Sequence, residues 1–365
     1  MSATDDRGPG QRVAPTIRDV ARLAEVSIGT ASKALNANGR LRQETRDKVI
    51  QVARQIGYRP NDLAQSLHRS KSMTVGIITN DSFGRFSFPI VEALEERLAD
   101  QGIAVFMCNA TDDPARERQH LDQLMGKRID GLVVTARRAD KRPPIGPFAH
   151  GLPVVYVYSQ ADDPDALSLV PDDEGGAVLA VSHLVGLGRT RIAHITGPER
   201  FDAVRLRRSG YARTLAASGL PARPDYYLPG AWSEAWGRDA VGTLFAAGRE
   251  HPDALFCGND QIARGAADAL RERGIDVPRD VAIVGFDNWE VMTAASRPPL
   301  SSVDMNLRAM GLEAGESLLA MIAGKRISGL RRLPCTLQVR GSSQPDDKDK
   351  GARRHSNAVH ERKSG

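Results

Sequence analysis

Short β-rich runs alternate with helix-length segments along most of this 365-residue chain. Alternation at this spacing predicts parallel sheets whose strands are joined by right-handed helical crossovers. More than ten such elements would make a single sheet unusually large, so we expect an α/β fold with two lobes and a cleft between them. Strands are expected at residues 74–79, 104–108, 131–134, 154–157, 192–195, 254–257 and 281–284, and helices at 89–100, 114–127, 174–187, 204–217, 233–247, 261–273 and 305–322.

A different pattern precedes the first of these strands. Thr16 and Asp19 have the spacing of a capping box, and the apolar face that follows ends at Ala24. Ser27 can cap a second short helix through about residue 35, and residues 42–56 have the periodicity of a third. Three small helices are therefore expected in a small N-terminal head, with one more possible helix at residues 61–68 in a polar linker.

Charge is distributed unevenly along the chain, although the formal net charge is only +5. Residues 15–71 contain 11 Lys and Arg against 5 Asp and Glu, while residues 72–345 carry a net charge of −3. A small basic head on a mildly acidic body indicates a chain whose head has an acidic partner such as nucleic acid.

Several classes of protein are excluded by what the sequence lacks. The three cysteines, Cys108, Cys257 and Cys335, are too few and too scattered for a disulfide framework or a zinc site, which fits a reducing compartment. No apolar run approaches the roughly 20 residues of a bilayer span, and the N-terminus has no apolar export segment. Phosphate-loop and HExxH motifs are missing, and Gly186-Leu187-Gly188 lacks the rest of a dinucleotide fingerprint. We expect a cytoplasmic protein that is not an enzyme and has no cofactor, metal site or membrane partner.

The spacing within residues 16–36 is typical of a helix-turn-helix, in which two short helices are joined by a tight turn. Its second helix would enter the major groove of DNA and would expose Ile28, Gly29, Ser32 and Lys33. Because similar spacing occurs in other small helical domains, two interpretations stay open at this point. One is a DNA-binding domain, and the other is a three-helix interaction module with a solvated basic face.

The residues of this segment closely resemble the N-terminal signature of the LacI/GalR (lactose repressor/galactose repressor) family of bacterial transcriptional regulators. The matching run is Thr16-Ile17-x-Asp19-Val20-Ala21-x-x-Ala24-x-Val26-Ser27-x-x-Thr30-x-Ser32-Lys33-x-Leu35-Asn36. The resemblance continues in Gly57-Tyr58-x-Pro60-Asn61, Asn259-Asp260 and Val284-Gly285-Phe286-Asp287-Asn288, and it covers about residues 15–339. It implies an all-α helix-turn-helix head and a two-lobed body that resembles periplasmic binding proteins, with parallel sheets.

The resemblance and the composition together divide the chain into five expected segments. The head is the DNA-binding domain, the linker is a hinge, and the body binds an effector and forms a dimer. The polar and charged ends have little to bury and are expected to be disordered. The boundaries are 1–14 for the N-terminus, 15–60 for the head, 61–72 for the hinge, 73–340 for the body and 341–365 for the tail.

In the LacI/GalR family the second helix reads base edges, which places Ile28, Gly29 and Lys33 at the reading positions. Lys33 stands where the family more often has Arg, and an ammonium discriminates guanine less sharply than a guanidinium fork does. Gly29 brings no side chain to read with and costs its helix roughly 1 kcal/mol relative to Ala, so direct readout is expected to be thin. The residues that match phosphate-holding positions are Thr16, Ser27, Thr30, Ser32, Asn36, Arg40, Thr45 and Tyr58.

Family members fold the hinge into a helix that lies in the minor groove and inserts a leucine between the central base pairs. That role would fall on Leu67, with Ala64 beside it, His68 near the DNA backbone and Asn61 at the start of the segment. From the residues alone, a plain amphipathic linker is the alternative interpretation.

The resemblance also implies an effector site between the two lobes. Aromatic rings there would stack on the C–H faces of a sugar while polar groups bracket its hydroxyls. The residues themselves allow other roles, because Trp232 could pack in a core, Arg205 could belong to a solvated basic run, and Asp287 could cap the next segment. Tyr158 departs from sugar-responsive relatives, which often have a carboxylate there, and this leaves the class of effector open. The implied positions are Asn80, Phe86, Tyr158, Arg205, Trp232, Asn259 and Asp287.

Together these features predict a transcriptional regulator, with repression favoured, that binds a palindromic operator in double-stranded DNA as a homodimer. A dimer is expected because one short reading helix binds weakly alone, and the tail has no leucine heptad of the kind that makes tetramers in some relatives. A small-molecule effector, with a carbohydrate favoured, would control it as an inducer or as a corepressor. The alternatives are a regulator or activator with a non-sugar ligand or no ligand, and a cytoplasmic solute-binding protein.

Overall fold

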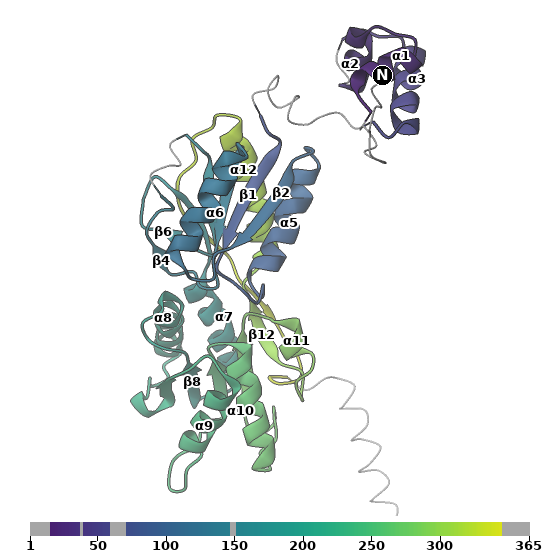
Figure 1. The fold of residues 1–365 in the computed structure, drawn as a ribbon. Coiled ribbons are helices and arrows are strands. Elements are labelled where there is room, and N and C mark those ends of the chain that lie inside the picture. The colour runs from purple at the N-terminus through teal and green to yellow at the C-terminus, as the bar shows by residue number, and fades with distance from the viewer. Residues whose placement is uncertain (1–14, 37–38, 59–70, 147–150, 345–365) are drawn as a thin grey trace, which may run out of the picture. The chain divides into compact units, whose positions relative to one another are not determined.

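The computed structural model describes residues 15–36, 39–58, 71–146 and 151–344 (Figure 1). The chain divides between Ser72 and Met73 into two compact units, the head and the body, and each is described by itself. The expected helix at residues 61–68 and the two terminal segments lie outside the described residues.

The head contains three helices: α1 (Ile17–Leu23), α2 (Ile28–Leu35) and α3 (Gln43–Gln55). The capping box that the spacing predicts is formed at the start of α1. In it, the amide of Thr16 donates a hydrogen bond to the carboxylate of Asp19 (3.0 Å). The turn between α1 and α2 is sharp because Glu25 adopts a φ of 55° and the amide of Val26 donates to the carbonyl of Ala21 (3.0 Å). A small core holds the helices together, formed by Val20, Ala21, Ala24, Ala31, Ala34, Val49 and Ala53.

The N-terminal lobe of the body is built on a six-stranded parallel sheet with the order β13-β7-β5-β3-β1-β2. Alternate residues of β1 serve opposite faces: Ile77 packs with the core under α5 and α12, while Ile78 packs under α6. The strands are β1 (Thr74–Thr79), β2 (Ala104–Asn109), β3 (Gly131–Thr135), β5 (Val154–Val157), β7 (Leu167–Pro171) and β13 (Gly329–Leu333); the helices are α5 (Ser87–Ala99), α6 (Pro114–Gly126) and α12 (Leu307–Ile322); β4 (Lys141–Arg142) and β6 (Gln160–Ala161) form a separate two-stranded ribbon.

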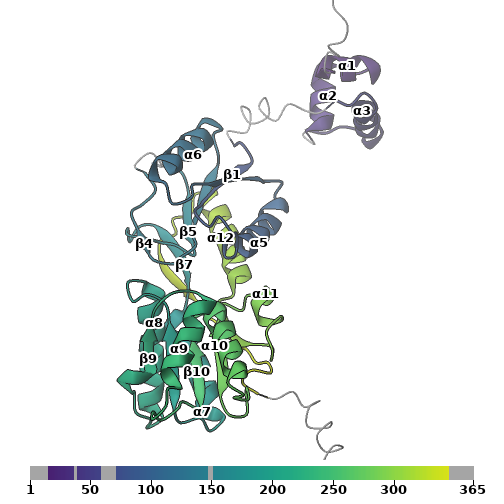
Figure 2. The same ribbon diagram turned by 60° about the horizontal axis from the view of Figure 1, so that its bottom comes forward.

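The C-terminal lobe repeats this plan with the strand order β14-β12-β11-β10-β8-β9, in which only the β12–β14 pair is antiparallel. In β10, Phe256 faces the core shared with α7 and α8, whereas Leu255 faces α9 and α10, which cover the other side (Figure 2). The strands are β8 (Ile192–Thr196), β9 (Tyr227–Pro229), β10 (Ala254–Cys257), β11 (Ala282–Phe286), β12 (Ser301–Asp304) and β14 (Thr336–Gln338); the helices are α7 (Asp173–Gly186), α8 (Asp202–Ala217), α9 (Glu234–Leu244), α10 (Asp260–Glu272) and α11 (Glu290–Thr293), with a 3₁₀ turn at Pro224–Tyr226.

Three short connections join the lobes: β7 to α7, β12 to α12, and β13 to β14. The loops at the carboxyl ends of strands in both lobes meet between them, because residues that follow β1 and β3 contact residues that follow β8, β10 and β11. Ligand sites of open α/β sheets lie at this edge. Within the described ranges, the helices are too short or too polar to span a membrane.

The sequence predicted the α/β class, the two lobes, the strands β1, β2, β3, β5, β8, β10 and β11, and the helices α5 to α10 and α12. It did not predict the short helix α11. It missed the short strands β4, β6, β7, β9, β12, β13 and β14, so the crossing that returns the chain to the N-terminal sheet was not foreseen. The body also continues beyond the expected boundary at residue 340. Ser342 and Ser343 are buried, and the hydroxyl of Ser342 donates to the carbonyl of Ile283 (2.7 Å).

Candidate functional site

The head presents the first turn of α2 to solvent. Ser27 caps this helix through its hydroxyl, which accepts a hydrogen bond from the amide of Thr30 (3.1 Å). Ile28 is exposed although it is large and apolar, and Gly29 and Lys33 are exposed beside it. A helix whose exposed face begins at a capped N-terminus, with an apolar residue and a cation on it, is suited to contact base edges and phosphates.

The other DNA-contact candidates lie around this helix. Thr16 and Arg40 are exposed, whereas Thr30, Ser32, Asn36, Thr45 and Tyr58 are partly buried. Asn36 donates to the hydroxyl of Ser32 (3.2 Å), and Thr16 donates to the carboxylate of Asp19 (2.8 Å). Hydrogen bonds from the amide and the hydroxyl of Thr16 lower the pKa of Asp19, and the bond from the amide is the largest cause. The hinge candidates Asn61, Ala64, Leu67 and His68 lie outside the described residues.

In the body, an aromatic pair stands on the N-terminal lobe at the lobe junction. The rings of Phe86 and Tyr158 are stacked with centroids 4.7 Å apart. Asp81 holds the loop before α5, because its carboxylate accepts from the amides of Phe86 (2.8 Å) and Ser87 (3.0 Å). Burial raises the pKa of Tyr158 well above its ordinary value, so its phenol is neutral at physiological pH. The pair offers a rigid aromatic surface at the end of β1 and β5.

A buried arginine on the C-terminal lobe lies near the same part of the lobe junction, close to Tyr158. Arg207 of α8 is only 3% exposed and donates to the carboxylate of Asp173 through Nε (2.8 Å) and Nη2 (2.6 Å). It also donates to the carbonyl of Gly258 (2.5 Å), and its guanidinium lies 3.5 Å from the centroid of the Phe286 ring. Nη1 of Arg207 is 3.9 Å from the carboxylate of Asp287. Two buried carboxylates therefore share one fixed guanidinium.

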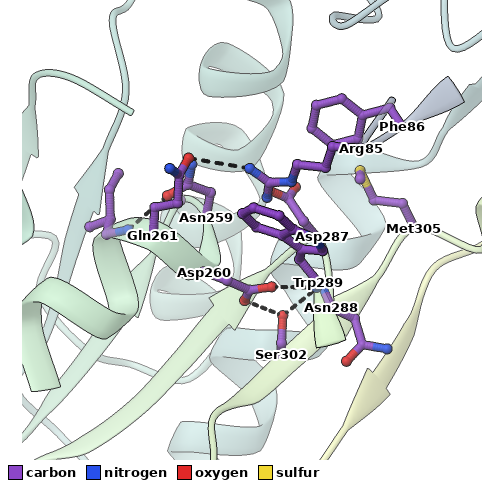
Figure 3. A network of polar contacts seen from close by, with 12 residues as sticks. Arg85, Phe86, Asn259, Asp260, Gln261, Asp287, Asn288, Trp289, Ser302 and Met305 are labelled. Carbon is purple, nitrogen blue, oxygen red and sulfur yellow. Dashed lines mark hydrogen bonds and ion pairs between the residues drawn. The ribbon is translucent and has the colours of Figure 1, made fainter. Parts of the chain in front are cut away.

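Arg85, from the loop between β1 and α5, crosses from the N-terminal lobe to the C-terminal lobe (Figure 3). Its guanidinium pairs with the carboxylate of Asp287 and donates to Oε1 of Gln261 (3.2 Å). It lies over the rings of Phe86 (4.8 Å) and Trp289 (4.6 Å). The cation and the carboxylate are both largely buried, at 13% and 5% exposed. This cluster closes one side of the junction between the lobes.

Behind this cluster lies a second carboxylate, Asp260, which is fully buried. It accepts from the amide of Trp289 (2.7 Å) and from the hydroxyl of Ser302 (2.6 Å). Burial, reinforced by the nearby charge of Asp287, raises the pKa of Asp260. Asp260 therefore fixes the loop that carries Asp287 and Trp289, and the fold favours its protonated form.

A second set of contacts joins the lobes elsewhere along this edge. Asp140, which follows β3, accepts a hydrogen bond from the amide of Asp202 at the start of α8 (2.8 Å). Arg138 lies over the ring of Phe201, 4.9 Å from its centroid. Beside these contacts is a cavity of about 870 Å³ whose lining includes Asn80, Asp140 and Phe201. Both sets of contacts describe a closed arrangement of the two lobes.

Three buried hydroxyls mark the carboxyl ends of the strands at this edge. Thr135 ends β3, Ser159 follows β5 and Thr196 ends β8, and the oxygen of each side chain has no hydrogen-bond partner. Buried polar groups are normally paired, so unpaired ones point to a binding partner such as a ligand or water. They lie on both lobes, as a ligand held between the lobes requires. Within the described ranges, His, Cys, Asp and Glu side chains form no group of three or more that could hold a metal ion.

The structure brings six of the seven predicted effector residues to this edge. Asn80 lines the cavity and accepts from the amide of Arg137 (2.9 Å). Asn259 caps α10 by accepting from the amide of Ile262 (2.9 Å). Trp232 packs on Gly197, directly after β8, where a Cβ would lie 2.2 Å from the indole ring. Phe86, Tyr158 and Asp287 are the three already described.

Arg205 does not join them, and its expected place is taken by Arg207. The side chain of Arg205 is 59% exposed, where it pairs with Asp202 and donates to the carbonyl of Arg200 (3.1 Å). Residues two apart on a helix point about 200° apart. The signal for Arg207 was present in the sequence, because Val204, Arg207 and Tyr211 fall on the buried stripe of α8 and Arg205 does not. Arg85, Asp173, Gln261 and Trp289 were also missed.

Comparison with known proteins agrees with both units. A profile of bacterial regulatory proteins of the lacI family matches residues 16–61, and a periplasmic binding protein-like domain matches residues 181–343. The chain is 30% identical over 335 residues to the HTH-type transcriptional repressor CytR of Escherichia coli (strain K12), covering 92% of this chain and 98% of that protein. The chain belongs to the LacI family.

Other relatives of this LacI-family chain are also transcriptional regulators. It is 32% identical over 317 residues to the HTH-type transcriptional repressor PurR of Haemophilus influenzae (strain PittEE), covering 85% of this chain and 92% of that one. Among solved structures, the Lac repressor dimer bound to operator and the anti-inducer ONPF has a TM-score of 0.76 at 27% identity, covering 91% and 99% of the two chains. The regulator CelR in complex with cellobiose has a TM-score of 0.64 at 26% identity, covering 90% and 100%. The LacI-family chain is therefore a DNA-binding transcriptional regulator with a periplasmic-binding-protein-like body.

Proposed function

We propose that this chain is a cytoplasmic repressor that binds a palindromic operator as a homodimer and responds to a small ligand held between its lobes. The observation that carries the ligand site is the meeting of side chains from both lobes at the carboxyl ends of their strands. A ligand there can shift the balance between open and closed lobes, and closure is a two-state motion that a hinge can transmit to DNA.

For the head, we propose that α2 lies in the major groove with Ile28, Gly29 and Lys33 toward base edges. The exposure of all three supports this assignment. Thr16, Ser27, Thr30, Ser32, Asn36, Arg40, Thr45 and Tyr58 are assigned to the phosphates, which position the head without specifying sequence. We assign the minor-groove wedge to Leu67, with Asn61, Ala64 and His68 beside it. Thin direct readout by Gly29 leaves more of the specificity to the deformability of the central base step.

The dimer is supported by large apolar side chains that the N-terminal lobe leaves exposed. Phe106 and Met107 are exposed on β2, which is the edge strand of its sheet, and Phe88 is exposed on α5. Exposed apolar groups of this size are typical of protein interfaces. A second copy is the partner we assign, because a palindromic site needs two heads related by two-fold symmetry.

A carbohydrate is the effector class that the cleft supports best. Phe86, Tyr158 and Trp232 provide aromatic surfaces, and Asn80 and Asp287 provide polar groups at the same edge. The relative CelR is solved in complex with cellobiose. A non-sugar ligand is the alternative, and Tyr158 favours it, because a neutral phenol there cannot bracket hydroxyls as strongly as a carboxylate.

The experiment that tests this function is selection of bound duplexes from a random DNA pool by the purified full chain at near-physiological salt, with and without candidate sugars. We expect enrichment of a palindrome with a flexible pyrimidine–purine step at its centre. Leu67→Ala should weaken binding to the selected site and abolish its bending in a gel-phasing assay. Leu187→Ala, at an exposed leucine that follows α7 in the body, is the matched control. Failure to enrich any site under all these conditions would contradict the proposed function.

A further inference from the structure

Arg85 occupies a slot formed by groups from both lobes. Its guanidinium carbon lies 4.8 Å from the centroid of the Phe86 ring, in its own lobe, and 4.6 Å from that of the Trp289 ring, in the C-terminal lobe. Asp287 and Gln261, both of the C-terminal lobe, accept its hydrogen bonds (Figure 3). A planar group held by aromatic faces and acceptors in its plane is bound as a small ligand would be.

We propose that Arg85 is an internal occupant of the effector site, which closes the lobes in the effector-free protein and which an effector displaces. The inference rests on the proposed function for its statement about the effector. Its statement about closure rests on the contacts of Arg85 alone. The slot adjoins the stacked pair Phe86 and Tyr158 and contains Asp287, so an effector bound there meets Arg85 first.

The surroundings allow Arg85 to leave without stranding a buried charge. Arg207 remains 3.9 Å from Asp287 and is itself fixed by Asp173 and Gly258, so the carboxylate keeps a cationic neighbour. Nε of Arg85 is buried without a hydrogen-bond partner, so the side chain is not fully satisfied in the slot. Phe83, two residues before Arg85 in the same loop, is 93% exposed, which shows that this loop borders solvent into which Arg85 can move.

The groups that line the slot of Arg85 define the class of effector that could replace its guanidinium. Asp287 is an acceptor, and in its present orientation Gln261 also presents an acceptor to the slot. A ring that replaces the guanidinium must therefore offer hydroxyl or amino donors at this end and apolar faces to Phe86 and Trp289. A carboxylate or phosphate at the same point would be repelled by Asp287. The slot thus selects a neutral or cationic ring rich in hydrogen-bond donors.

Arg85→Ala in the effector-free full chain tests closure directly. We expect its radius of gyration, measured by small-angle X-ray scattering, to rise above that of the wild type as the lobes open. The matched control is Arg238→Ala, which removes an exposed ion pair with Glu272 inside the C-terminal lobe and should leave the radius unchanged. Arg85→Met, which keeps the aliphatic stem, is the second variant, and circular dichroism checks that each variant is folded.

Guanidinium chloride at low millimolar concentration tests whether the slot itself is the point of action. In Arg85→Ala the free ion should enter the vacated slot, restore the wild-type radius and change the fluorescence of Trp289. Equal concentrations of urea and sodium chloride should do neither, and the fluorescence change should vanish when Trp289→Phe is added.

Opening that guanidinium reverses would support the proposal. An unchanged radius in both Arg85 variants would overturn it, and so would opening that guanidinium fails to reverse, since Arg85 would then act as a tether outside any slot. All these measurements are made without DNA. Their failure is therefore distinct from failure of the operator selection, which would contradict the proposed function instead.

Discussion

The carboxylate of Asp140, in the N-terminal lobe, accepts a hydrogen bond from the amide of Asp202, the first residue of α8 in the C-terminal lobe, with Oδ1 and N 2.8 Å apart. The residue before α8 is Phe201, whose side chain makes no capping hydrogen bond. The first amides of a helix have no partner within the helix, so an acceptor must come from elsewhere. Here the other lobe supplies it, and closing the lobes completes the N-terminus of α8.

Removing this carboxylate should loosen the start of α8. Loss of a side-chain cap costs about 1 kcal/mol, which corresponds to roughly fivefold faster opening of the first turn. We expect Asp140→Ala to show this increase in hydrogen–deuterium exchange of the peptide that covers the first turn of α8, and Asp140→Asn to show less because its amide oxygen still accepts. Asp162→Ala, which removes a more exposed carboxylate paired with Lys141, is the control. Equal exchange in Asp140→Ala and wild type would show that the contact does not stabilise the helix.

Arg205→Ala and Arg207→Ala should have very different effects, although the two residues are only two positions apart in the sequence of α8. Arg207→Ala leaves Asp173 buried without its guanidinium, and breaking a buried pair by removing one partner costs about 3–5 kcal/mol. Arg205→Ala removes an exposed pair and should change the free energy of unfolding by less than about 0.5 kcal/mol. Urea denaturation of both variants makes the comparison. Similar losses would mean that the network around Arg207 contributes little to the fold.

Local patterns explain why the sequence predicted most of the fold. The capping box at Thr16 and Asp19 and the cap at Ser27 are interactions between residues three apart, so a reader of the sequence can see both partners at once. The alternating β-rich runs likewise carry their own signal. Strands β12, β13 and β14 are only three to five residues long. Their positions depend on pairing with strands that are distant in the sequence, so no local sequence pattern predicts them.

The candidate site was predicted less completely because its contacts join distant parts of the chain. Arg85 and Asp287 are 202 residues apart, and nothing near either residue indicates the other. The family resemblance supplied Phe86, Tyr158 and Asp287 but could not supply Arg85, whose role here depends on the closed arrangement of this particular chain. The helical periodicity of α8 could have predicted that Arg207 is buried. Arg205 was predicted instead, and it is two residues away in the same run of arginines and lies on the exposed side of the helix.

Two helical glycines should respond in opposite ways to replacement by alanine. A Cβ on Gly29 would meet only the Ser27 hydroxyl at 3.8 Å, so Gly29→Ala should stabilise the head by up to about 1 kcal/mol through helix propensity. A Cβ on Gly210 would lie 2.4 Å from the carbonyl oxygen of Glu174, so Gly210→Ala should destabilise the body. Thermal unfolding followed by circular dichroism measures both. A destabilised Gly29→Ala head would show that α2 needs the glycine backbone.

His194 should make the body sensitive to acid. It is fully buried on β8, and its ring stacks on that of Phe256 with centroids 4.5 Å apart. Its Nδ1 is hydrogen-bonded to the backbone carbonyl of Phe256 (2.9 Å). Burial lowers the pKa of His194 from 6.5 to about 4. The unfolded chain therefore binds a proton at His194 below pH 6.5, whereas the folded chain binds it only near pH 4. The stability that the neutral imidazole contributes is therefore fully present above pH 6.5 and is lost as the pH falls toward 4.

Over that window the loss due to His194 should reach about 3 kcal/mol, from the shift of its pKa at about 1.4 kcal/mol per unit. Urea denaturation at a series of pH values should show this slope in the wild type and a shallower one in His194→Gln, which cannot titrate but can still donate to the Phe256 carbonyl. His251→Gln, at an exposed histidine, is the matched control and should keep the wild-type slope. If His194→Gln also keeps that slope, the acid sensitivity arises from other groups, and the buried imidazole is not what limits stability at low pH.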